Sequence, residues 1–89
     1  MNSRIEQADV ISTVGDYISS TMLVGFGDQS IEPDESLVQL GVVDSTGVLE
    51  LVEFLHKRFG IDVKDEEITL ENLDSLNAIG AFVRRKLEG

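Results

Sequence analysis

The stretch that decides the fold is residues 44–60, which reads DSTGVLELVEFLHKRFG. Its apolar residues recur at spacings of three and four, which predicts an amphipathic helix with one buried face. The helix opens near Asp44 and Ser45, and it closes at Gly60 because glycine readily adopts the left-handed conformation that ends a helix. The buried face is expected to consist of Val48, Leu51, Val52, Leu55 and Phe59. The opposite face carries Thr46, Leu49, Glu50, Glu53, His56 and Lys57.

A second long helix is predicted before this stretch. Ser3 and Glu6 have the spacing of a capping box, in which each side chain bonds the backbone N–H of the other residue. The helix continues to about Leu23 and is stopped by Gly25. Its apolar stripe is expected to consist of Ile5, Ala8, Ile11, Val14, Ile18 and Met22.

A third long helix is predicted near the end of the sequence, where Ser75 can cap its first turn. Its inward side chains are expected to be Leu76, Ile79, Phe82, Val83 and Leu87. The same helix contains the small residues Ala78, Gly80 and Ala81. These are compatible with close helix packing and equally with helices that part around a ligand.

The connection between the first two of these helices is long. Residues 25–35 are polar and acidic, and residues 36–41 read as a single turn ended by a glycine. In that turn, Leu37 and Leu40 are expected to hold the connection against the core.

The connection before the last helix is shorter and irregular. Residues 65–73 read as one or two short helical turns with possible N-caps at Asp65 and Thr69. No strand is expected. The predicted fold is therefore all-α: a small four-helix bundle with three longer helices, a short irregular third helix and a long loop between the first and second. A single domain is expected over residues 1–89.

Composition narrows the possible partners. The 89 residues include 7 basic and 17 acidic side chains, which give a net charge of −10. Such a charge repels nucleic acid and anionic membrane surfaces, and it favours partners with basic patches. The sequence has no cysteine, which excludes disulfides and thiolate metal sites. It also shows no membrane-spanning run and no signal peptide, so a cytoplasmic protein without membrane insertion is expected.

Three groups of polar residues resemble chemical sites but have simpler explanations. His56 is the only histidine and has no residues at the spacing that would orient it as a base. The acidic residues 62–67 lack the glycine and the alternating pattern of a calcium loop, so no metal is expected. Glu50 and Glu53 lie on a convex helix surface, which offers no pocket to raise a carboxyl pKa. They favour a recognition surface for a basic partner over an enzyme active site.

Ser45 has two interpretations from the residues alone. A serine at the beginning of a helix is commonly a cap. It also follows a glycine-containing loop, lies beside the negative charge of Asp44, and faces the unpaired N–H groups of a helix N-terminus, which accept a phosphate.

The same residues resemble the acyl carrier protein family, which includes peptidyl and D-alanyl carriers. The resemblance rests on residues 40–55 (LGVVDSTGVLELVEFL), residues 59–61 (FGI) and residues 73–79 (LDSLNAI), and it extends over essentially the whole chain. It implies a bundle of acyl-carrier type. It also implies that a phosphopantetheinyl transferase esterifies Ser45 with 4′-phosphopantetheine from coenzyme A, which makes the protein a phosphoprotein. The thiol of that arm would hold acyl or aminoacyl groups as thioesters.

The resemblance also implies which residues meet partner enzymes. Asp44 would accompany the attached cofactor, and the docking residues would be Thr46, Leu49, Glu50, Glu53 and His56. The partners would be the transferase, a loading ligase and downstream acyl-processing enzymes. The carrier would be a monomer and not an enzyme.

Two departures from the family pattern indicate the kind of carrier. Thr46 stands where the family usually has Leu or Met, and His56 and Lys57 interrupt the acidity that is usual on this face. In addition, Gly47 is similar to the specialised and D-alanyl carriers. We therefore expect a dedicated carrier in fatty acid or specialised lipid biosynthesis. The alternative is an unmodified acidic helical interaction module in which Ser45 is only a cap.

Overall fold

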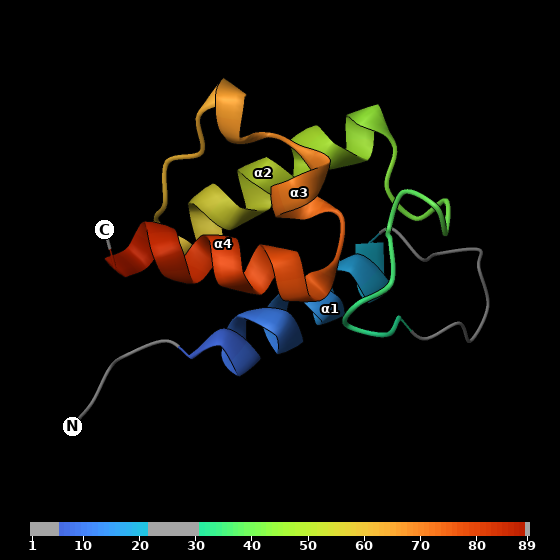
Figure 1. Cartoon of the computed structure of the whole chain (residues 1–89), viewed down its shortest axis with the longest axis horizontal. Helices are drawn as coiled ribbons and strands as arrows, with labels where there is room; N and C mark the ends of the chain where they lie inside the picture. Colours follow the sequence, from blue (N-terminus) through green and yellow to red (C-terminus); the bar gives the residue numbers. More distant parts are fainter. Residues whose placement is uncertain (1–5, 22–30, 89) are drawn as a thin grey trace.

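The computed structural model describes residues 6–21 and 31–88 (Figure 1). Its helices are α1 (Gln7–Thr21), α2 (Ser45–Phe59), the 3₁₀ turn η1 (Asp65–Glu67), α3 (Leu70–Leu73) and α4 (Leu76–Glu88). Within the described ranges the chain has no strand, which confirms the predicted all-α bundle. In Figure 1, α4 runs between α1 and α2, and residues 31–44 lie on the side opposite the C-terminal end of α4. No helix in these ranges has the length and apolarity needed to cross a membrane.

Helix α2 has the bounds that the sequence predicts. Asp44 precedes it in extended conformation, and Gly60 follows it with φ 71°, a left-handed conformation. Leu51, Leu55 and Phe59 are buried as predicted. Val48 and Val52 are only half-buried.

Helix α1 differs from the prediction at its beginning. Glu6 precedes the helix, and its backbone N–H donates to Oδ2 of Asp9 at 3.2 Å. Asp9 thus plays the part that the prediction gave to Glu6. The predicted cap Ser3 and the stop at Gly25 lie outside the described residues, as do Ile5, Met22 and Leu23.

The buried face of α1 confirms part of the prediction. Val14 and Ile18 are fully buried as predicted, and Ile11 is half-buried. Ala8, which was predicted to face inward, is exposed, and Val10, which was not predicted, is fully buried. The actual face repeats every four residues. The prediction followed an apolar series that included Ala8 and missed Val10.

Helix α4 packs closely against α1. A Cβ atom on Gly80 would lie 3.0 Å from Cγ of Gln7 and 3.0 Å from Cγ1 of Ile11. Of the two interpretations of its small residues, close packing is therefore the one seen at Gly80. The predicted inward residues of α4 are buried except Leu87, which is 39% exposed because it lies in the last turn.

The connections agree in most respects with the sequence analysis. Leu37 is fully buried and Leu40 half-buried, so the turn at 36–41 does contact the core. Thr69 caps α3, since its Oγ1 accepts from the N–H of Asn72 at 3.3 Å. Asp65 is not a cap: it is the first residue of η1, and Lys64 occupies the cap position.

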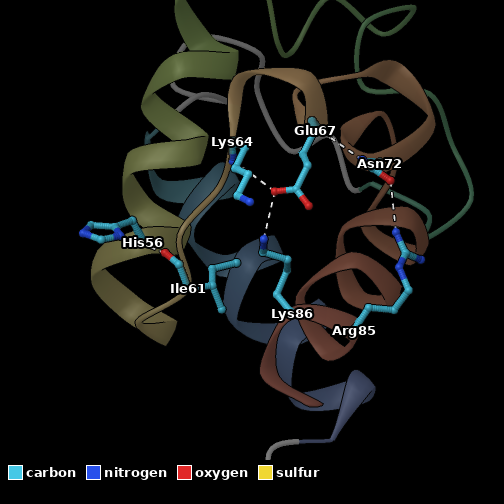
Figure 2. A network of polar contacts seen from close by, with 7 residues as sticks. All are labelled: His56, Ile61, Lys64, Glu67, Asn72, Arg85 and Lys86. Atoms are coloured by element: carbon cyan, nitrogen blue, oxygen red, sulfur yellow. Dashed lines mark hydrogen bonds and ion pairs between the residues drawn. The ribbon is translucent and has the colours of Figure 1, made fainter. Parts of the chain in front are cut away.

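Glu67 joins the segment after α2 to α4 (Figure 2). Its Oε1 accepts from the backbone N–H of Lys64 at 3.0 Å and pairs with Nζ of Lys86 at 2.9 Å. The Lys64 hydrogen bond, and after it the Lys86 ammonium, lowers the pKa of this carboxyl. Asn72 Nδ2 donates to the Glu67 carbonyl at 2.9 Å, and Arg85 Nη2 donates to Asn72 Oδ1 at 3.1 Å.

Candidate functional site

At the N-terminal end of α2, the residue that caps the helix and the first residue inside the helix have different roles. Oδ1 of Asp44 accepts from the N–H of Gly47 at 2.7 Å, and the Asp44 carbonyl accepts from the N–H of Val48 at 2.8 Å. Asp44 is therefore the N-cap, and Ser45 is the first residue inside the helix. Of the two interpretations of Ser45, the one in which it is the helix cap is wrong, because the side chain of Asp44 accepts the N–H of Gly47.

The side chain of Ser45 therefore does not cap the helix. Its side chain is exposed, and among the described residues it makes no hydrogen bond. By contrast, Gly47 two positions later is buried. At the beginning of α2, the Asp44 carboxylate thus bonds the Gly47 N–H, and the Ser45 side chain is exposed.

The chain that leads into Ser45 is firmly held. Val42 and Val43 are buried, and their N–H groups donate to the carbonyl of Leu37 at 3.0 and 3.3 Å. Leu37 is itself fully buried. The loop therefore presents Ser45 from an ordered stretch of backbone.

The predicted docking residues lie together on the exposed side of α2. Thr46, Glu50, Glu53 and His56 are exposed, and Leu49 is 62% exposed. An apolar side chain with two carboxylates nearby on one helix face is a common composition for a transient protein contact.

The electrostatics of this face are dominated by its two glutamates. Lys57 lies 3.8 Å from Glu53, but both side chains are about 70% exposed, so the pair contributes little. Burial raises the pKa of the Tyr17 phenol, and the negative charges of Glu50 and Glu53 raise it further. Tyr17 could not be assigned to this face from sequence, because only the packing of its ring on Phe54 of α2 brings it there.

His56 also has a structural contact. Its Nδ1 lies 2.7 Å from the carbonyl of Ile61 (Figure 2). A carbonyl oxygen only accepts, so Nδ1 carries the proton, and Nε2 is left for solvent or a partner. His56 therefore fastens the end of α2 to the next segment while remaining on the exposed face.

An apolar cavity of about 140 Å³ lies beside the first turns of α2. Its lining comes from three segments: Val38, Val48, Ile68, Thr69, Leu70 and Leu73. Val48 follows Ser45 by one helical turn. Leu70 and Val38 are 63% and 41% exposed, so the cavity opens between apolar side chains. The sequence analysis missed it because its walls are far apart in the chain.

The chemistry open to this end of α2 is limited to an accessible hydroxyl. The Asp44 carboxylate is engaged by Gly47, and His56 lies eleven residues along the helix, about 16 Å away at 1.5 Å per residue. His56 is therefore too far along the helix to take the proton of Ser45. The arrangement suits a group that another protein transfers to the hydroxyl.

Comparison with known proteins agrees with this geometry. The family described as "Phosphopantetheine attachment site" matches residues 22–83, well over half of the chain. A search of curated proteins found no matching relative. The matched residues include the long connection, α2, α3 and most of α4. The chain therefore belongs to the family of carrier proteins that hold 4′-phosphopantetheine as a covalent prosthetic group.

Proposed function

We propose that Ser45 is the residue to which 4′-phosphopantetheine is esterified, and that the protein delivers acyl or aminoacyl thioesters to partner enzymes. The observation that carries this proposal is that capping and side-chain exposure fall on two different residues at the beginning of α2. Asp44 caps the helix, and the Ser45 hydroxyl is exposed without a hydrogen-bond partner in the described structure.

The residues present fit the proposed group. A phosphoester on Ser45 would lie at the N-terminus of a 15-residue helix, where the helix dipole favours negative charge. In the transfer, Ser45 Oγ would bond to the phosphorus next to the pantetheine of coenzyme A and lose its proton to a base of the transferase, while 3′,5′-ADP leaves. The attached arm supplies a terminal thiol, which this cysteine-free chain does not have.

The exposed face of α2 supports docking to enzymes with basic surfaces. We assign this role to Thr46, Leu49, Glu50, Glu53 and His56, which are all exposed. The net charge of −10 would speed encounters with such partners, and this steering weakens with salt. The partners in this proposal are a phosphopantetheinyl transferase, a loading ligase and downstream acyl-processing enzymes.

The same proposal makes the chain a carrier and not a catalyst. Asp44 caps the helix through its Oδ1, and His56 lies at the other end of α2. Thr46 and Gly47 favour a dedicated carrier for one pathway, acting as a single domain.

The test is intact mass spectrometry after incubation with coenzyme A and a broad-specificity phosphopantetheinyl transferase. We expect wild type to gain the mass of one phosphopantetheine arm and Ser45→Ala to gain none. Ser20→Ala is the matched control, because Ser20 is an exposed serine on α1, and this variant should be modified like wild type. An unchanged wild-type mass, or addition to Ser45→Ala, would overturn the assignment.

A further inference from the structure

The junction between α3 and α4 is bonded to three consecutive residues of the long connection. Asp74 Oδ2 accepts from the hydroxyl of Ser36 at 2.6 Å, and its Oδ1 accepts from the N–H of Val38 at 3.0 Å. The Asp74 carbonyl accepts from the N–H of Leu37 at 2.6 Å. One residue thus holds a segment that lies 36 to 38 positions earlier in the sequence.

These bonds continue toward Ser45 through the backbone. The carbonyl of Leu37, whose N–H is held by Asp74, accepts from the N–H groups of Val42 and Val43. Val43 directly precedes Asp44, the N-cap of α2. An unbroken series of hydrogen bonds therefore leads from the Asp74 backbone to the residue before the cap.

The Asp74 carboxylate supports this series on both sides of Leu37. It fixes Ser36 and Val38 with charge-assisted hydrogen bonds, which are stronger than those between neutral groups. Ser36 Oγ in turn accepts from the N–H of Gln39 at 3.1 Å, so the turn itself is organised around this contact.

The same carboxylate joins two walls of the apolar cavity beside α2. Val38 is one wall and is bonded to Asp74 through its N–H; Leu73, another wall, is the residue directly before Asp74. Loss of the carboxylate would therefore weaken the link between the loop wall and the α3 wall, leaving the backbone bond from the Leu37 N–H to the Asp74 carbonyl.

We infer that Asp74 is a positioning residue that sets the conformation of residues 36–43 and thereby the presentation of Ser45 to the transferase. The effect on modification rests on the proposed function of Ser45. The effect on the backbone does not, and it can be measured separately.

The first measurement is amide hydrogen exchange of the unmodified protein. In Asp74→Ala we expect the amides of Val38, Val42 and Val43 to exchange at least about tenfold faster, because local opening no longer has to break the carboxylate bonds. The matched control is Glu67→Ala, which removes another carboxylate that joins two segments, at the far end of α2. In the control these amides should be unchanged. Equal exchange in wild type and Asp74→Ala would overturn the inference.

The second measurement is the rate of transfer from coenzyme A, made at a temperature at which circular dichroism shows each variant to be fully helical. We expect kcat/KM for Asp74→Ala to fall about tenfold, since small misplacements of a reacting group are costly. Ser36→Ala removes one of the bonds and should show a smaller loss in the same direction. If Asp74→Ala does not fold, Ser36→Ala is used in its place. Glu67→Ala should stay within about twofold of wild type.

The outcomes separate the two proposals. A wild-type protein that accepts no arm would overturn the function proposed for Ser45, while the exchange data would still decide whether Asp74 holds the loop. A modified wild type with an Asp74→Ala rate equal to that of Glu67→Ala would overturn the positioning role alone.

Discussion

Each of the two segments that flank α2 is held by a carboxylate, yet the two arrangements differ in kind. After the C-terminal end, the Glu67 carboxylate pairs with the Lys86 ammonium and accepts a hydrogen bond from the Lys64 N–H. These contacts join the segment after α2 to α4. Before the N-terminal end, the Asp74 carboxylate accepts hydrogen bonds from the Ser36 hydroxyl and the Val38 N–H, which belong to the loop before α2.

The difference lies in what each end leaves exposed. The C-terminal end is closed by Gly60 and by the contact of His56 with Ile61. At the N-terminal end Asp44 is the cap, and within residues 6–21 and 31–88 the Ser45 hydroxyl has no hydrogen-bond partner. The side chain of Ser45 is accessible at this end of the helix because the adjacent residue, Asp44, provides the cap. Three experiments test the contrast between the two ends.

The largest effect is expected from reversing charge in the middle of the exposed face of α2. Glu50→Lys/Glu53→Lys should slow association with a basic partner enzyme by about tenfold at low salt and flatten its salt dependence, because steering attraction is lost. Stopped-flow measurements with the transferase would give the rates.

The control for this prediction applies the same change in net charge at the other end of α2. Asp65→Lys/Glu66→Lys alters two exposed acids of η1, away from the proposed docking face. It should slow association much less. Equal slowing by both double variants would show that only net charge matters and would remove the α2 face from the interface.

A smaller effect is expected from the cap. Asp44→Ala should lower the free energy of unfolding by about 1 kcal/mol, the typical cost of losing an N-cap side chain. Ser45→Ala should change it by less than about 0.5 kcal/mol, as for an exposed residue without partners. Urea unfolding followed by circular dichroism measures both. A larger loss for Ser45→Ala than for Asp44→Ala would contradict the assignment of Asp44 as the cap.

The bounds and the exposed face of α2 could be predicted from sequence, because they depend on capping residues and apolar spacing within the helix itself. The bounds of α2 follow from Asp44, Gly60 and the apolar spacing between them, and the exposed face follows from the same period. The choice between Asp44 and Ser45 as the cap could not be predicted, since both are good N-caps and backbone conformation decides between them.

Contacts between distant segments were also beyond the sequence analysis. Ser36 and Asp74 are separated by 38 positions, and neither carries a local pattern that points to the other. The apolar cavity beside α2 was missed for the same reason. Leu87 continued the apolar period of α4 but lies past the end of the core, where periodicity no longer implies burial.

The smallest effect is expected from titration of Glu67. Its pKa is lowered in the folded protein, by the Lys64 hydrogen bond first and Lys86 second, so the ionised form stabilises the fold. This contribution is fully present above the ordinary glutamate pKa of 4.5 and is lost as the pH falls through the lower, folded-state pKa. Glu67→Gln should therefore reduce the loss of Tm seen below that pH, while Glu66→Gln, an exposed neighbour, should not. Identical acid profiles of Tm for wild type and Glu67→Gln would show that this carboxylate does not stabilise the packing of the segment after α2 on α4. In that case the two ends would differ more than the geometry indicates, with only Asp74 holding its segment in place.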